Sequence, residues 1–143
     1  AFLSVKLSKL ELQNAKRSKL AAIYHQELNC LDDLILPSCL DAAKSVNHVF
    51  AVRMKDNMRA ALIKHLQEDN IGTNIHYPLP FYLQAAYKDL GYSSGAFQIT
   101  EKISQEELSL PLDAYHTEEE IRYICQSIKS FFKKYEQQSK QQL

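Results

Sequence analysis

Apolar residues recur every three or four positions near the start of the chain, which is the spacing of one face of an α-helix. Leu3, Leu7 and Leu10 begin this stripe, and Tyr24 lies on its continuation. The pattern predicts one long helix over residues 2–28, about 40 Å in length at 1.5 Å per residue.

The start of this helix has none of the residues that usually cap a helix N-terminus. Ala1-Phe2-Leu3 already lies inside the apolar pattern, and no Ser, Asp or Pro precedes it. We therefore expect the chain to begin within a long inter-domain helix; a frayed natural terminus is the alternative.

Four short segments have the composition of β-strands. The clearest is Val46 to Met54, VNHVFAVRM, which is β-branched and aromatic. Residues 73–77 and 108–112 are further candidates. Residues 34–36 form an expected edge strand, because Pro37 must end a strand or lie at its edge.

Three shorter helices are predicted between these strands. The first carries an apolar stripe from Met58 to Leu66 and stops at Asn70-Ile71-Gly72. The second covers residues 84–90, and the third covers residues 97–107.

The last predicted helix has the strongest boundary signal. Thr117 and Glu120 have the spacing of a capping box, and apolar residues recur at helical spacing from Ile121 to Tyr135. The final residues, EQQSKQQL, have no apolar face, so we expect residues 135–143 to be disordered.

This order of elements predicts an α+β fold, with a small, mostly antiparallel sheet, helices on one face, and the long helix in front. A sheet this small leaves one face for another domain to cover. We expect the chain by itself to self-associate, because exposed apolar patches drive association.

Composition narrows the classes of partner. The chain has 143 residues, the size of one domain, and Lys plus Arg equals Asp plus Glu at 17 each. This balance argues against nucleic acid and anionic membranes, which need a basic face. No apolar run approaches the roughly 18 residues of a membrane helix, and no signal peptide opens the chain. We expect a cytoplasmic protein.

No catalytic unit is visible in the sequence itself. Cys30, Cys39 and Cys125 have neither a disulfide nor a zinc spacing, and we interpret them as reduced, packed thiols. With only three glycines there is no Gly-rich phosphate loop, and there is no His-Glu-x-x-His.

His76-Tyr77-Pro78 is the one local cluster with the features of a ligand site. It follows a predicted strand, and Pro78 and Pro80 stiffen the exit from that strand. A histidine donates or accepts hydrogen bonds at neutral pH, and a tyrosine adds a flat face and a hydroxyl. The alternative is that both side chains only pack or face water.

Other polar residues offer less. Arg53 and Arg59 flank a strand-to-helix turn, where they either bind an anion or, as is more common, are solvated or pair with neighbours. Four further histidines share no metal-ligand spacing with a carboxylate: His25, His48, His65 and His116.

Three segments together resemble the DegT/DnrJ/EryC1/StrS family of nucleotide-sugar aminotransferases. The opening AFLSVKLSKLELQNAKRSKLAAIYHQEL is similar to a family helix, matching at Ala1, Leu3, Lys6, Leu7, Leu10, Asn14, Arg17, Tyr24 and either Ala21 or Ala22. A middle block resembles the family's Gly-Ile-x-Thr-x-x-His-Tyr-Pro segment, matching at Phe50, Arg53, Arg59, Leu62, Leu66, Ile71, Gly72, Thr73, His76, Tyr77, Pro78, Pro80 and Gln84. The segment ELSLPLDAYHTEEEI is similar to the family's Leu-Ser-Leu-Pro ending.

The resemblance implies that residues 1–134 are the C-terminal small domain of a fold-type I pyridoxal phosphate enzyme. The cofactor and its Schiff-base lysine would belong to a large domain outside these residues, so no catalytic, cofactor-binding or metal residue is expected here. By the same resemblance, His76, Tyr77, Pro78 and Gln84 are the expected substrate-binding residues.

For the intact enzyme, the resemblance implies a homodimer that transfers an amino group from L-glutamate to a nucleotide-linked keto-deoxyhexose, for polysaccharide or related sugar synthesis. The AFLSVKL opening resembles the branch that aminates the 3-keto position of dTDP-6-deoxyhexoses. The 143-residue chain alone would be inactive.

One alternative is a stand-alone regulatory or dimerisation module that binds a small metabolite. Another enzyme of the same cofactor fold, such as a desulfurase, is a second alternative.

Overall fold

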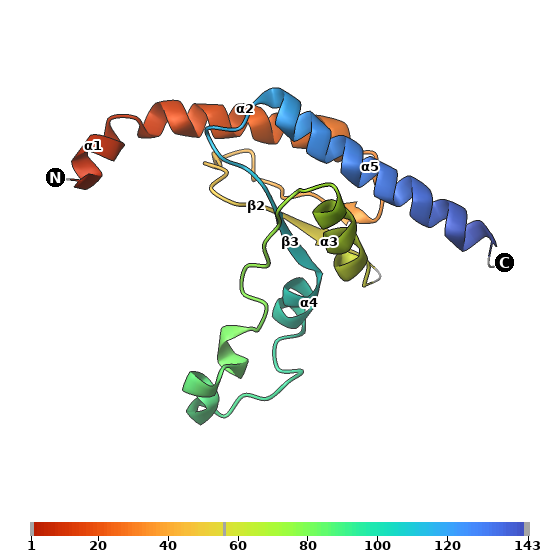
Figure 1. Ribbon diagram of the computed structural model, residues 1–143. Coiled ribbons are helices and arrows are strands. Elements are labelled where there is room, and N and C mark those ends of the chain that lie inside the picture. The colour runs from red at the N-terminus through yellow and green to blue at the C-terminus, as the bar shows by residue number, and fades with distance from the viewer. Residues whose placement is uncertain (1, 56, 142–143) are drawn as a thin grey trace.

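The computed structural model describes residues 2–55 and 57–141. The chain forms five α-helices, two 3₁₀ helices and three strands within these residues (Figure 1). In chain order they are α1 (Phe2–Leu7), α2 (Leu10–Leu28), β1 (Leu34–Ile35), β2 (Phe50–Met54), α3 (Arg59–Glu68), η1 (Phe81–Leu83), η2 (Ala85–Leu90), α4 (Gln98–Glu106), β3 (Glu107–Leu110) and α5 (Glu118–Gln141).

The three strands form one antiparallel sheet in the order β1-β2-β3. This confirms the predicted α+β fold with a small antiparallel sheet. Of the strand expected over residues 73–77, only a single bridge forms, in which Asn74 and Ser109 exchange backbone hydrogen bonds of 3.2 and 2.8 Å.

The two faces of the sheet differ in composition because successive side chains of a strand point to opposite sides. Phe50 and Val52 pair with Leu110 and Leu108 and are fully buried on one face. The helices α2, α3 and α5 cover this face, and α2 and α5 lie side by side along it (Figure 1). Their apolar side chains complete the core: Leu20, Tyr24, Leu28, Leu62, Leu66, Ile121, Cys125 and Ile128.

A charged cluster also joins α2 to α5. Glu27 on α2 accepts hydrogen bonds from Lys129 at 2.6 Å and from Arg122 at 2.7 Å, both on α5. Its side chain is only about a quarter exposed, at 28%. The two helices are therefore held by ion pairs at the edge of their apolar contact.

The predicted helix over residues 2–28 is interrupted, which corrects that expectation. Ser8 donates its hydroxyl to the Val5 carbonyl at 2.8 Å, and the Lys9 amide bonds Lys6 three residues back. A serine that bonds the preceding turn competes with the helical ladder. Every residue of α1 is exposed, so no packing opposes the break.

The apolar side chains of α1 and the start of α2 are exposed: Phe2, Leu3, Val5, Leu7, Leu10 and Leu12. Self-association of the chain by itself stays a prediction. No helix in the described ranges is long and apolar enough to cross a membrane.

The capping box of the last helix forms as predicted. The Glu120 amide donates to the Thr117 hydroxyl at 3.2 Å, and the Thr117 amide donates to the Glu120 carboxylate at 2.7 Å. The helix then continues to Gln141, which differs from the disorder expected over residues 135–143. Glu, Gln and Lys are good helix formers, and neither Gly nor Pro interrupts them. The last two residues lie outside the described part.

Residues 75–106 leave the sheet and return to it as an arm, which contains η1, η2 and α4 and extends from the body (Figure 1). Glu101 on α4 holds the outer part of the arm together through hydrogen bonds. Its carboxylate accepts hydrogen bonds from the Tyr82 hydroxyl, from the Gly95 amide at 2.7 Å and from the Ser94 hydroxyl at 3.1 Å. The arm thus has an internal polar anchor.

Candidate functional site

A hollow of about 540 Å³ lies between the arm and the sheet face that the helices leave uncovered. We call it the open-face hollow. Its lining includes Ala51 of β2, Glu107 of β3, Ile103 of α4, and His48, His76 and Tyr77. The structure therefore brings two of the predicted site residues, His76 and Tyr77, to one concave surface.

His76 is fixed from both its backbone and its ring. The His76 amide donates to Oε2 of Glu107 at 2.8 Å, and Nδ1 lies 2.7 Å from the Ser109 hydroxyl oxygen. Ser109 in turn donates its hydroxyl to Oε1 of Glu107. These three residues form a closed hydrogen-bonded group between the start of the arm and β3.

Tyr77 lies at the rim of the same hollow. Its side chain is 80% exposed, so its ring and hydroxyl are accessible to a ligand. Its φ is +57°, in the left-handed region that residues other than glycine seldom occupy. Strained backbone of this kind is often found at binding sites.

The other two predicted site residues are not brought to the hollow. Pro78 is exposed and does not line it. Gln84 precedes η2, and its amide donates to the Leu79 carbonyl at 3.4 Å within the arm. Pro80, predicted only to stiffen the backbone, does line the hollow.

Three residues at the site were not predicted from the sequence. His48 lines the hollow together with His76, although the two are far apart in the chain. Glu107 and Ser109 are buried polar residues on β3, at 6% and 5% exposure. The spacing of this pair in the sequence could have revealed them. Glu107 and Ser109 flank the apolar Leu108, and alternate residues of a strand share a face, so both lie on the face opposite the core.

The two arginines at the strand-to-helix turn pair with neighbours, which is one of the expected outcomes. Arg59 donates to the Ser104 carbonyl at 2.7 Å and to the Glu107 carbonyl at 3.2 Å. Arg53 lies 3.8 Å from the Glu106 carboxylate, which is ion-pairing but not hydrogen-bonding distance. Arg59 therefore ties α3 to the junction of α4 and β3.

The lining residues do not fit pyridoxal phosphate. The cofactor needs a lysine amine for its Schiff base and positive or N–H groups for its phosphate. Among the described residues, no Lys or Arg lines the open-face hollow or the second, smaller hollow that His76 also lines. Within the described ranges there is also no group of three metal-ligating side chains.

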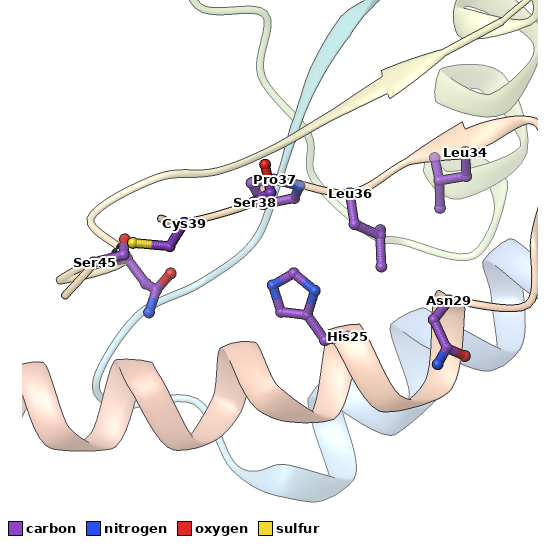
Figure 2. A pocket seen from close by; sticks show the side chains of 9 residues that line it. His25, Asn29, Leu34, Leu36, Pro37, Ser38, Cys39 and Ser45 are labelled. Atoms are coloured by element: carbon purple, nitrogen blue, oxygen red, sulfur yellow. Dashed lines mark hydrogen bonds between the residues drawn. The ribbon is translucent and has the colours of Figure 1, made fainter. Parts of the chain in front are cut away.

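A separate hollow of about 580 Å³ lies between α2 and the loop after β1 (Figure 2). His25 projects into it from α2, and its ring meets the Phe50 ring in an edge-on arrangement with centroids 5.3 Å apart. Cys39 lines it and is exposed, as is Cys30, whereas Cys125 is buried. The expectation of three packed thiols is therefore wrong for two of them, because both lie in exposed connecting segments.

The comparisons with known proteins agree with this architecture. Residues 1–129 match the model of the DegT/DnrJ/EryC1/StrS aminotransferase family. The chain belongs to this family. This confirms the family resemblance that the sequence motifs indicated.

Two curated relatives and one solved structure illustrate the match. The chain is 36% identical over 130 residues to the erythromycin biosynthesis sensory transduction protein EryC1 of Saccharopolyspora erythraea, covering 91% of this chain and 35% of that protein. It is 35% identical over 131 residues to the dTDP-3-amino-3,6-dideoxy-alpha-D-galactopyranose transaminase of Aneurinibacillus thermoaerophilus. This match covers 92% of this chain and 35% of that protein. It superposes on the structure of S. venezuelae DesV in complex with a ketimine intermediate, with a TM-score of 0.86 and 29% identity. The superposition covers 91% of this chain and 34% of the DesV chain.

The chain spans about a third of the length of the curated relatives it matches. Structures of family relatives in pyridoxal- and pyridoxamine-phosphate forms indicate that the family depends on this cofactor.

Proposed function

We propose that residues 1–134 are the C-terminal small domain of a pyridoxal-phosphate-dependent nucleotide-sugar aminotransferase. The observation that carries the proposal is the open-face hollow, which has hydrogen-bonding groups but no lysine or arginine in its lining. A wall of this composition suits the uncharged, hydroxyl-bearing hexose of a substrate and leaves the cofactor to another part of the protein.

In the proposed reaction, an amino group passes from L-glutamate to the 3-keto carbon of a dTDP-linked 6-deoxyhexose. Pyridoxal phosphate, held outside this chain, supplies the electron sink. His76 binds a sugar hydroxyl, and the exposed Tyr77 ring covers one face of the hexose. The transaminase name of the Aneurinibacillus relative supports this substrate class. We further propose that the enzyme is a cytoplasmic homodimer.

The proposal is tested with the intact protein by following the cofactor absorbance in two half-reactions. L-glutamate alone should convert the cofactor to its amine form, and a dTDP-3-keto-6-deoxyhexose should convert it back and yield the amino sugar. A 4-keto isomer should react much more slowly. Equal turnover of both isomers would contradict the 3-keto assignment, and no reaction with any keto sugar would contradict the function.

His76→Ala should slow the sugar half-reaction and leave the glutamate half-reaction unchanged. His116→Ala is the matched control, because His116 does not line the hollow and its ring accepts a hydrogen bond from the Asp113 amide. Equal loss in both half-reactions would argue against a sugar-side role for His76.

The alternative of a stand-alone module is tested separately on the gene. A reading frame that encodes a Schiff-base lysine domain before Ala1 supports the aminotransferase, whereas translation that starts at Ala1 supports the module. We predict that the 143-residue chain alone shows neither the visible absorbance of a bound cofactor nor turnover.

A further inference from the structure

Glu107 is a buried carboxylate at the edge of the open-face hollow. It is 6% exposed, and its side chain forms no ion pair among the described residues. Both of its oxygens accept hydrogen bonds, Oε2 from the His76 amide and Oε1 from the Ser109 hydroxyl. A buried carboxylate that holds two neighbours rather than a cation has an orienting effect on them.

The direction of these hydrogen bonds determines the protonation of the His76 ring. Ser109 has one hydroxyl hydrogen, and that hydrogen is donated to Glu107. The contact of 2.7 Å between Ser109 Oγ and His76 Nδ1 therefore requires Nδ1 to be the donor. In a neutral imidazole the other nitrogen, Nε2, is then an acceptor.

We propose that Glu107 and Ser109 are positioning residues that hold His76 in its Nδ1–H tautomer. Nε2 then presents a lone pair to the open-face hollow and accepts the hydrogen of a ligand hydroxyl. This inference rests on the proposed function for the identity of that ligand, which is the hexose of a nucleotide-linked sugar. In this proposal Glu107 and Ser109 do not contact the ligand and act on it only by positioning His76.

The tautomer is measured directly by long-range ¹H–¹⁵N NMR correlation on the 143-residue chain at a pH where His76 is neutral. We expect a protonated Nδ1 and an unprotonated Nε2 in the wild type. In Ser109→Ala the preference should be lost, because Nδ1 then has no partner. A wild-type spectrum with Nε2 protonated overturns the proposal.

Glu107→Gln gives a sharper test. If the amide oxygen accepts the His76 backbone N–H, the amide nitrogen faces Ser109 and donates to its oxygen. Ser109 is then free to donate to Nδ1, so the tautomer should shift towards Nε2–H. Ser104→Ala is the matched control, since its hydroxyl donates only to the Glu101 carbonyl although Ser104 lines the same hollow. An unchanged tautomer in both Glu107→Gln and Ser109→Ala overturns the proposal.

A second readout in the intact protein separates this inference from the proposed function. Ser109→Ala should raise KM for the keto sugar about tenfold, as expected for weakening one ligand hydrogen bond by about 1.4 kcal/mol, and should not alter the glutamate half-reaction. If the intact protein aminates no keto sugar while the tautomer results hold, the proposed function fails and the tautomer assignment stands. An unchanged KM with an altered tautomer overturns the ligand contact.

Discussion

The hydroxyl of Tyr24 on α2 donates a 2.7 Å hydrogen bond to the carbonyl of Pro111, just beyond β3. The Tyr24 side chain is fully buried, and its ring stacks on Phe50 with centroids 4.7 Å apart. Burial also raises the pKa of Tyr24, so the phenol stays protonated as a donor. One side chain thus fixes the position of α2 on both β2 and the segment after β3.

Tyr24→Phe should lower the free energy of unfolding by about 1–2 kcal/mol, because it leaves the Pro111 carbonyl without its donor while keeping the packed ring. Urea denaturation of the chain measures this. Tyr123→Phe is the control, because the Tyr123 hydroxyl bonds the Asp69 carbonyl at an exposed position, and it should change stability by less than about 0.5 kcal/mol. Equal effects would contradict the structural role of Tyr24.

The ion pairs of Glu27 should make stability depend on pH. The Lys129 hydrogen bond and charge, with a smaller contribution from Arg122, hold the pKa of Glu27 below its ordinary value of 4.5. A group whose pKa is lowered by folding stabilises the fold above its unfolded pKa, and this stabilisation is lost as the pH falls through the folded pKa.

We therefore predict that Glu27→Gln lowers the urea midpoint at pH 7 and that the difference from wild type shrinks as the pH falls below 4.5. Glu68→Gln on the exposed face of α3 is the control and should show no such difference. A difference at pH 3 as large as at pH 7 would rule out the Glu27 ion pairs as its cause.

The three thiols should differ in reactivity. Burial, with a smaller effect of Glu27, raises the pKa of the Cys125 thiol to about 12, whereas Cys30 and Cys39 are exposed. Because the thiolate is the reactive form, a thiol reagent at pH 8 should modify two cysteines of the folded chain and the third only after unfolding. Fast modification of Cys125 in the native chain would contradict its burial.

Loss of the Glu101 anchor should loosen the arm without unfolding the body. In Glu101→Gln, the amides of residues 92–97 should exchange hydrogen faster, because the bonds from Tyr82, Ser94 and Gly95 are weakened. Exchange of β2 should be unchanged. Faster exchange throughout the chain would mean that the arm and body unfold as one unit.

Much of the fold follows from local patterns in the sequence. The alternation in β2 and the capping box of α5 specify their elements without reference to the rest of the chain. The break at Ser8 and the helix beyond Tyr135 were not predicted. Apolar periodicity indicates which residues pack on the core, and α1, Glu136 and Gln137 are exposed. Residues 73–77 were expected to form a strand but pair only at Asn74.

The site was predictable only in part. The His76-Tyr77 pair was visible because the two are adjacent and followed by proline. Glu107 and His48 were not, because they reach the hollow only through the tertiary fold. Ser109 was not visible either, because only the folding of the arm onto β3 brings it to His76. Pro78 and Gln84 were inferred from resemblance, and in this chain they do not line the hollow.

The most direct test of the account is the structure of the intact protein with its cofactor–sugar adduct bound. The account predicts that the hexose occupies the open-face hollow, with a hydroxyl oxygen within about 3.2 Å of His76 Nε2 and the Tyr77 ring against the sugar. A hexose bound elsewhere, with this hollow filled by another part of the protein, would contradict it.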